Sequence, residues 1–350
     1  MKESKINLKG LTLTELENFF EEINEEKFRA KQMFNWLYHH KVDSFRKITT
    51  FTKTLKDRLN KIATIESLKL LDEQTSDNSK TIKYLFECSD GAKIESVLIP
   101  EANRLTLCIS TQVGCPLDCK FCATGQMGYK RNLSTGEIID QYLQISRVIS
   151  EPITNIVYMG MGEPFLNYSN VINSMNIFSS ELAFGISGKR VTVSTVGIPD
   201  KIKTFAQEPF RGKLAFSLHS VDEQIRSKIM PINKKFPFKQ NIDALEYFYK
   251  STKRKITFEY TLLKGINDQE SDIKGIVKLS KRIPCKVNII PFNSIAHTNP
   301  SGIAATLKPT SKEEFDFFVE RLRSNNVTVF VRNTQGDDIE GACGQLAIKL

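Results

Sequence analysis

The regular alternation of short apolar segments with longer amphipathic ones across residues 105–332 constrains the fold more than any other feature of the chain. Strand character is found near residues 105–111, 154–160, 190–196, 213–219, 256–263, 286–292 and 327–332. Helical spacing of apolar residues is found near 135–149, 168–182, 222–229, 239–251, 269–282 and 311–325. This α/β pattern predicts a parallel sheet with right-handed crossovers, either open or curled into a barrel. Functional side chains are then expected at the carboxyl ends of the strands.

The chain before this region follows a different pattern. Apolar residues at helical spacing predict three short helices within about the first 65 residues. An Asp90-Gly91 turn between the alternating segments 82–86 and 93–100 predicts a β-hairpin. We therefore expect three units: a helical accessory domain at 1–75, a hairpin connector at 76–103 and a main domain at 104–350.

Positive charge is concentrated in the expected accessory domain. The formal net charge of the chain is +9, and only Asp43 and Asp57 oppose the basic residues between positions 41 and 61. These basic residues are Lys41, Arg46, Lys47, Lys53, Lys56, Arg58 and Lys61. They form either an ordinary solvated helical face or a surface that follows the phosphates of a nucleic acid. Charge alone does not separate the two interpretations.

The composition restricts where the protein works. With 350 residues, 40% of them hydrophobic, the chain can form one large core and a small second domain. It has no run of about eighteen apolar residues, which excludes a membrane-spanning helix. The N-terminal sequence also lacks the apolar stretch of a secretory signal. We expect a cytoplasmic protein that does not contact a membrane.

Three cysteines provide the strongest chemical signal. Cys115, Cys119 and Cys122 have the spacing C-x3-C-x2-C and directly follow a predicted strand. Three thiolates on one loop can bind three irons of a [4Fe–4S] cube and leave the fourth iron open to an external ligand. A structural zinc site needs four ligands, and no Cys or His at zinc-finger spacing completes such a set. Chance clustering of buried cysteines is the remaining alternative.

Weaker signals lie at the ends of other predicted strands. In Gly160-Met-Gly-Glu-Pro164 the glycines permit close approach of a ligand and the glutamate offers an acceptor, although an ordinary glycine-rich turn has the same composition. His219 follows the apolar segment 214–218 and is either a core histidine or a ligand contact. Cys343 lies in a loop rich in Gly and Asp, and an inert thiol is the simplest interpretation of a lone cysteine.

Taken together, these segments resemble the RlmN family of the radical S-adenosylmethionine (SAM) superfamily. The resemblance rests on Cys108-Ile-Ser-Thr-Gln-Val-Gly-Cys115-Pro-Leu-Asp-Cys119-Lys-Phe-Cys122-Ala-Thr-Gly, Met159-Gly-Met-Gly-Glu-Pro164, Val193-Ser-Thr-Val-Gly197, Phe216-Ser-Leu-His-Ser220 and Gly336-Asp-Asp-Ile-Glu-Gly-Ala-Cys343-Gly-Gln345. It runs in order from about residue 12 to the C-terminus. It implies a partial (βα)6 radical SAM barrel with a small N-terminal helical accessory domain. It also implies a [4Fe–4S] cluster, SAM on its open iron, and methylation of C2 of adenine in 23S rRNA and tRNA.

The resemblance assigns roles to individual residues. Positions that match SAM contacts in the family are Gly162, Glu163, Ser194, Ser217, Leu218, His219 and Asn293. Cys343 matches the cysteine that is methylated by the first of two SAM molecules used per turnover. Cys108 matches the thiol that resolves a covalent protein–RNA intermediate, which leaves a transient Cys108–Cys343 disulfide. Glu95 matches the proton acceptor, and whether Glu95 or Cys108 removes the C2 proton stays open.

Two rival functions follow from the same residues. A Cfr-type enzyme would methylate C8 of the rRNA adenine, but Pro164 and Val113 favour the C2 group. An iron–sulphur protein that binds RNA or senses redox state without turnover would need neither Cys343 nor the SAM contacts. The expected partners are 23S rRNA, tRNA and an electron donor such as flavodoxin or ferredoxin with its reductase. Cys88 and Cys285 match no motif and are expected to be structural.

Overall fold

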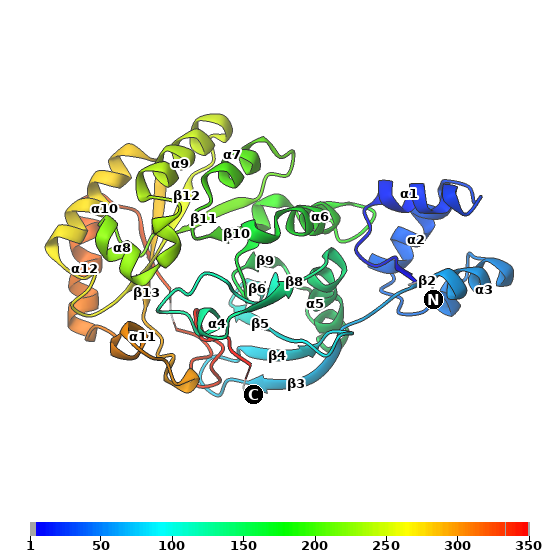
Figure 1. Cartoon of the computed structure of the whole chain (residues 1–350), viewed down its shortest axis with the longest axis horizontal. Helices are drawn as coiled ribbons and strands as arrows, with labels where there is room; N and C mark the ends of the chain where they lie inside the picture. Colours follow the sequence, from blue (N-terminus) through cyan, green and yellow to red (C-terminus); the bar gives the residue numbers. More distant parts are fainter. Residues whose placement is uncertain (1–4, 333, 349–350) are drawn as a thin grey trace.

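The computed structural model describes residues 5–332 and 334–348, so the outermost ends of the expected first and last domains, 1–4 and 349–350, lie outside it, as does residue 333. Figure 1 shows a small helical module (blue) beside a large sheet covered by helices. We define the helical module as residues 5–68. Its elements are β1 (Ile6–Asn7), α1 (Leu13–Glu22), α2 (Phe28–Tyr38), α3 (Lys53–Ile62) and β2 (Ala63–Thr64).

The three helices of the helical module agree with the predicted ones. The side chain of Thr12 accepts a hydrogen bond from the Glu15 amide, and that of Glu15 accepts one from the Thr12 amide, so a capping box begins α1. Leu55 and Leu59 bury one face of α3 while most basic side chains of 41–61 stay exposed. The basic segment therefore forms a solvated surface of the helical module.

The main sheet has ten strands in the order β14-β13-β12-β11-β10-β9-β6-β5-β4-β3. Its parallel part comprises β6 (Arg104–Cys108), β9 (Asn155–Tyr158), β10 (Val191–Thr195), β11 (Lys213–Ser217), β12 (Ile256–Leu262), β13 (Cys285–Pro291) and β14 (Val329–Val331). The strands β3 (Lys69–Thr75), β4 (Ile82–Glu87) and β5 (Lys93–Glu101) extend it in antiparallel fashion beyond β6. Neighbouring strands of the parallel part follow one another along the chain, as they do in a (βα) barrel. Among the described residues, the edge strands β14 and β3 do not pair, so the barrel is not closed.

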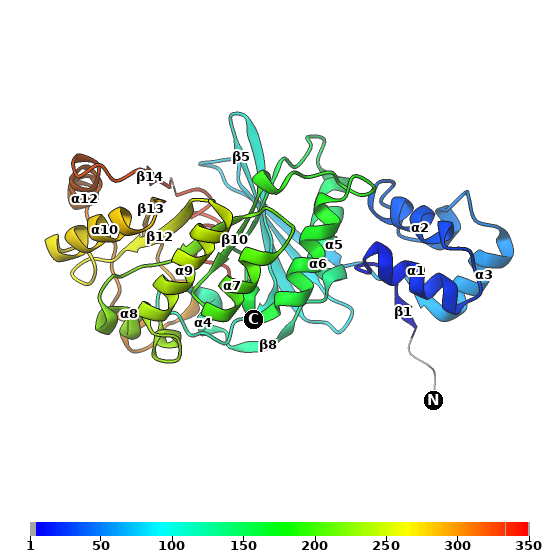
Figure 2. The ribbon, with the colours of Figure 1, turned by 90° about the horizontal axis from the view of Figure 1, so that it is seen from above.

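Helices follow the parallel strands in six βα units and lie along one face of the sheet (Figure 2). The main ones are α5 (Thr135–Val148), α6 (Tyr168–Ser179), α7 (Pro199–Gln207), α9 (Phe238–Thr252), α10 (Glu270–Arg282) and α12 (Lys312–Ser324). Shorter helices are α4 (Ala123–Gln126), α8 (Glu223–Ile229) and α11 (Ile303–Thr306). This is the partial (βα)6 barrel that the resemblance to the RlmN family implied.

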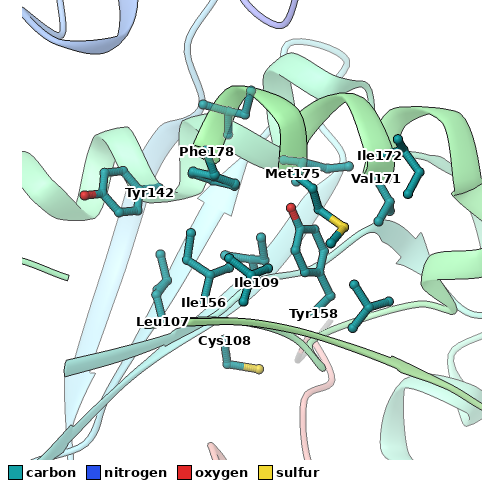
Figure 3. Packing of buried hydrophobic residues seen from close by; sticks show 14 of the residues in the cluster. Leu107, Cys108, Ile109, Tyr142, Ile156, Tyr158, Val171, Ile172, Met175 and Phe178 are labelled. Carbon is teal, nitrogen blue, oxygen red and sulfur yellow. The ribbon is translucent and has the colours of Figure 1, made fainter. Parts of the chain in front are cut away.

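Side chains at and just after the end of β6 alternate between the two faces of the sheet. Leu107 and Ile109 point toward α5 and α6, where they meet buried side chains such as Tyr142 and Phe178 (Figure 3). Cys108 points to the other side of the strand. The apolar face of the sheet thus forms the core, and the opposite face is left for polar and sulphur-containing side chains.

Apart from the short elements β1, β2, α4 and α11, which were also not expected, the structure differs from the expected elements in three places. Strand β3 begins at Lys69, inside the range expected to be helical, and its mostly exposed residues lack apolar alternation. Helix α7 and the small hairpin of β7 (Gln112–Gly114) and β8 (Tyr129–Asn132) were not foreseen. No helix among the described residues is both long and apolar enough to cross a membrane.

Candidate active site

An open cavity lies where the parallel strands end, and it contains about 970 Å³ of space when the solvent at its mouth is included. Ten of the thirteen predicted site residues line it: Cys115, Cys119, Cys122, Gly162, Glu163, Ser194, Ser217, His219, Asn293 and Cys343. Segments far apart in the sequence therefore meet in one place, as expected for the carboxyl ends of parallel strands.

The three-cysteine loop joins β7 to α4 and is fixed by main-chain bonds. The Cys115 amide donates to the Gly128 carbonyl at 2.8 Å, and the Cys122 amide donates to the Cys119 carbonyl at 3.1 Å. Gly114 has φ +74°, and a Cβ there would lie 1.9 Å from the Gly128 carbonyl oxygen. Only glycine fits this turn, which aims the loop into the cavity.

The three cysteine thiols are buried beside one another. Burial raises the pKa of Cys115 to about 12 and that of Cys119 well above its usual value, and the neighbouring thiols raise both further. Burial also raises the pKa of Cys122. Three thiolates here would therefore need a compensating positive charge, which the irons of a cluster would provide.

The number of ligands favours a cluster over a single zinc ion. A structural zinc site takes four protein ligands. A [4Fe–4S] cube with one open iron takes three thiolates, each on a different iron. Cys115, Cys119 and Cys122 therefore fit the cube better than they fit zinc.

Gly162 and Glu163 follow β9 and are held rigidly. A Cβ on Gly162 would lie 2.5 Å from the side chain of Gln112, and the φ of +99° also favours glycine. The Glu163 carboxylate accepts hydrogen bonds from the amides of Phe165 and Val196, each at 2.9 Å. Burial raises the pKa of Glu163 to about 7. Each of its oxygens keeps a lone pair that can accept from an amino group in the cavity.

His219 lies after β11 in a fixed tautomer. Its Nδ1 accepts from the Thr261 amide at 2.9 Å, and its carbonyl accepts from Asn267 Nδ2 at 2.6 Å. Burial lowers the pKa of His219 to about 3, so the ring is neutral and carries its proton on Nε2. Ser217 lines the cavity beside it, whereas the side chain of Leu218 is fully buried and does not line the cavity.

This histidine should make the protein sensitive to acid. Unfolding returns the pKa of His219 from about 3 to about 6.5, so the unfolded chain takes up a proton between these pH values. The free energy of unfolding should fall as pH drops through this window, by several kcal/mol because one pKa unit is about 1.4 kcal/mol. In His219→Asn, whose side chain tolerates the φ of +49°, urea unfolding at pH 6.5 and 4.5 should show a smaller fall. Equal falls in variant and wild type would contradict this.

Cys343 reaches the cavity because its loop is bonded to two other segments. The Ala123 amide donates to the Gly344 carbonyl at 2.7 Å, which connects the loop to the start of α4. Asn293 Nδ2 donates to the Cys343 carbonyl at 3.1 Å, which connects it to the end of β13. Asn293, predicted from the sequence as a SAM contact, thus also positions Cys343.

Arg332 is a site residue that the sequence analysis missed. It follows β14 and lines the cavity, and its Nη1 lies 3.5 Å from Met159 Sδ. Burial raises the pKa of Cys108 to about 12 and the nearby Cys343 raises it further, while Arg332 opposes the shift. The charge of Cys343 is the largest factor that raises the pKa of Arg332. Cys108, Cys343 and Arg332 therefore lie close together, although Cys108 does not itself line the cavity.

Glu95, in β5, lies outside the lining of the cavity. Its Oε1 is 3.5 Å from Lys83 Nζ, and no hydrogen bond from the described residues reaches its buried Oε2. Burial raises its pKa, while Lys83 opposes the shift. A carboxyl group with a raised pKa and a free oxygen is suited to accept a proton.

Arg226 is a second residue without a sequence signal. It is fully buried, and its guanidinium donates to the carbonyls of Leu218 at 3.1 Å, Val196 at 2.7 Å and Ser217 at 3.0 Å. These carbonyls lie where β10 and β11 end. Arg226 thus organises the backbone that presents the polar residues of the cavity.

Comparison with known proteins agrees with this geometry. Residues 6–65 match the family description "Ribosomal RNA large subunit methyltransferase N-terminal domain", and residues 109–277 match "Radical SAM superfamily". A crystal structure of a radical SAM methyltransferase from Sphaerobacter thermophilus has a TM-score of 0.90 and 37% sequence identity, covering 97% of this chain and 98% of that one.

Two relatives match along almost their whole length. The probable dual-specificity RNA methyltransferase RlmN of Flavobacterium johnsoniae is 41% identical over 353 residues, covering 100% of this chain and 99% of the relative. The dual-specificity RNA methyltransferase RlmN of Alcanivorax borkumensis is 40% identical over 354 residues, covering 98% and 91%. Radical SAM enzymes use a [4Fe–4S] cluster and SAM. The chain belongs to the RlmN family of radical SAM RNA methyltransferases.

Proposed function

We propose that this enzyme methylates C2 of adenine in 23S rRNA and in tRNA, with Cys343 as the residue that carries the methyl group. The observation that supports this most is that Cys343 lines the same cavity as Cys115, Cys119 and Cys122. A cysteine from the last loop of the chain is not needed to bind a cube that already has three thiolates. A further cysteine is needed if the protein itself carries the methyl carbon before it reaches the RNA.

The cluster residues and the SAM contacts have separate tasks in this proposal. Cys115, Cys119 and Cys122 hold the [4Fe–4S] cluster, which when bound supplies the electron that cleaves SAM to a 5′-deoxyadenosyl radical. Glu163 accepts hydrogen bonds from the amino group of SAM. The remaining predicted contacts, Gly162, Ser194, Ser217, Leu218, His219 and Asn293, line or support the walls around it.

The methyl group travels through Cys343 in two stages. As a thiolate, Cys343 first takes a methyl group from one SAM molecule, because C2 of adenine is not nucleophilic and cannot attack SAM directly. After hydrogen abstraction by the radical from a second SAM, the carbon on Cys343 bonds to C2. The adduct then loses the C2 proton and one electron, which the oxidised cluster would accept when bound. Attack of the Cys108 thiolate on the Cys343 sulphur breaks the bond between sulphur and carbon, and the released CH2 carbon takes up a proton to give the methylated base. A Cys108–Cys343 disulfide remains, which a cellular reductant must open.

Two buried groups assist Cys108 in this scheme. A thiol with a pKa of about 12 is a poor nucleophile at neutral pH, and Arg332 is the cation that favours its thiolate. Glu95, with its free oxygen and raised pKa, accepts the C2 proton. Cys108 would then attack the Cys343 sulphur and would not remove the C2 proton.

The rest of the chain supplies binding and location. We propose that the helical module, which lies within the expected first domain 1–75, binds RNA through the basic surface around 41–61, and that 104–350 form the catalytic barrel. The segment 76–103 was expected to be a connector, but its strands β4 and β5 continue the sheet of the barrel together with β3. The enzyme works in the cytoplasm with an electron donor such as flavodoxin or ferredoxin with its reductase. The family match over residues 6–65 supports the assignment of the first domain.

In vitro methylation tests the proposed substrates. Anaerobically reconstituted enzyme is incubated with SAM, a reductant and separate 23S rRNA and tRNA fragments, and the product base is identified by mass spectrometry. We expect 2-methyladenine in both RNAs. 8-Methyladenine would instead establish the Cfr-type reaction. SAM cleavage without a methylated base would contradict the methyltransferase function.

A further inference from the structure

A fully buried ion pair joins the helical module to the catalytic barrel. Lys9 Nζ lies 2.6 Å from Asp140 Oδ1, and the two side chains are 0% and 1% exposed. Lys9 Nζ also donates to Ser67 Oγ at 2.7 Å, and the Leu68 amide donates to Asp140 Oδ2. Both the entrance to the helical module at Lys9 and its exit at Ser67–Leu68 are therefore held by one carboxylate of α5.

The backbones of the helical module and of α5 are in tight contact beside this pair. A Cβ on Gly10 would lie 2.2 Å from the Gly136 amide nitrogen, and a Cβ on Gly136 would lie 2.4 Å from the Lys9 carbonyl oxygen. The Gly10 amide donates to the hydroxyl of Tyr38 at 2.8 Å, so the same contact reaches α2. The helical module thus sits on the first turns of α5 in one defined orientation (Figures 1 and 2).

The next residue of the same helix faces the catalytic sheet. Gln141 Oε1 accepts from Ser96 Oγ at 2.6 Å and from the Ser110 amide at 2.8 Å, and its Nε2 donates to the Ser110 carbonyl at 2.9 Å. Ser96 adjoins Glu95 in β5, and Ser110 follows Cys108 by two residues. Consecutive residues of α5 therefore bond the helical module on one side and the strands of the catalytic residues on the other.

We propose that Lys9 and Asp140 are positioning residues that fix the helical module on α5, so that RNA held by this module presents its target adenine to the catalytic cavity in one register. This inference rests on the proposed function, because it assumes that the module binds RNA. Buried ion pairs contribute little net stability compared with apolar residues of the same size, but they define one orientation when both partners are present. An apolar contact has no required geometry and would tolerate a shift of the module along α5. The ion pair holds only when its two charged groups lie next to each other.

A double-mutant cycle on the reconstituted holoenzyme tests the proposal. The variants are Lys9→Met, Asp140→Asn and the double variant, in which the amide introduced at position 140 keeps an acceptor for the Leu68 amide and no unpaired charge remains. Asp243→Asn is the matched control, since it breaks an exposed ion pair with Arg282 on the surface of the barrel. The readouts are kcat and KM for RNA, methylation of Cys343 without RNA, and hydrogen exchange of residues 66–68.

We expect each single variant to raise KM for RNA by about tenfold with kcat changed by less than about twofold, and the double variant to recover most of the loss. Exchange at 66–68 should accelerate in the single variants, while Cys343 methylation stays at the wild-type level. Wild-type KM values in all variants would overturn the proposal. A parallel loss of kcat and of Cys343 methylation would also overturn it, because the pair would then serve general stability.

Two further measurements separate a failure of this proposal from misfolding and from a failure of the proposed function. If the single variants do not fold, Gly136→Ala carries the test, because it disturbs the same contact without touching a charge, and it should raise KM for RNA selectively. If the wild-type enzyme methylates no RNA, the proposed function fails by itself. Exchange at 66–68 in the variants then still shows whether the pair fixes the helical module, and wild-type exchange there would overturn the positioning role.

Discussion

Cys343→Ala and Cys108→Ala should both abolish RNA methylation, but they should stop the reaction at different points. Without the Cys343 thiol, the protein should never acquire a methyl group from SAM. Without the Cys108 thiol, methylation of Cys343 and bond formation to the base should proceed, and protein covalently linked to RNA should accumulate. Denaturing electrophoresis with labelled RNA and mass spectrometry of the C-terminal peptide measure the two outcomes.

The reason for the difference lies in the arrangement of the two thiols. Cys343 lines the cavity, whereas Cys108 lies near Cys343 and Arg332 but outside the lining. Cys285→Ala is the matched control, because Cys285 is partly buried at the opposite end of its strand and should leave turnover intact. Normal turnover of Cys108→Ala without RNA attached would show that the resolving role is wrong.

Arg226→Met should cause a large loss of stability. The substitution keeps the aliphatic stem but leaves the carbonyls of Val196, Ser217 and Leu218 without their donor in a buried site. Breaking a buried charged network in this way costs about 3–5 kcal/mol. For a chain of this length the melting temperature of the reconstituted enzyme should fall by about 5 °C.

Two further variants identify the cause of that loss. Arg226→Lys keeps a positive charge but cannot donate to several carbonyls from one plane, so it should recover only part of the stability. Arg282→Met removes an arginine whose ion pairs are exposed, and it should change the melting temperature by less than about 1 °C. If Arg226→Met melted like the wild type, the strand ends would not depend on this guanidinium.

The sequence predicted the parts of the structure that depend on local patterns. Apolar periodicity located the parallel strands and most helices, because each such element must bury one face. The spacing of Cys115, Cys119 and Cys122 and their position after a strand also placed them in the cavity with Glu163 and His219. These residues share an edge of the sheet, and strand direction alone brings them together.

The missed features depend on contacts between distant segments. Arg226 and Arg332 carry no motif, and their roles arise only when carbonyls or thiols from other strands surround them. Strand β3 is mostly exposed, so pairing with β4 defines it rather than an apolar pattern. The ion pair of Lys9 and Asp140 joins residues 131 positions apart, and nothing in either local sequence predicts it.

The proposed chemistry requires that Cys115, Cys119 and Cys122 hold a [4Fe–4S] cluster whose open iron binds SAM. Iron and sulphide content, the visible absorption spectrum and 5′-deoxyadenosine release should be measured on protein prepared without air. We expect about four irons per chain, a reducible cluster spectrum and SAM cleavage, all lost in a variant with the three cysteines changed to alanine. Tight zinc binding with no cluster spectrum under these conditions would contradict the account.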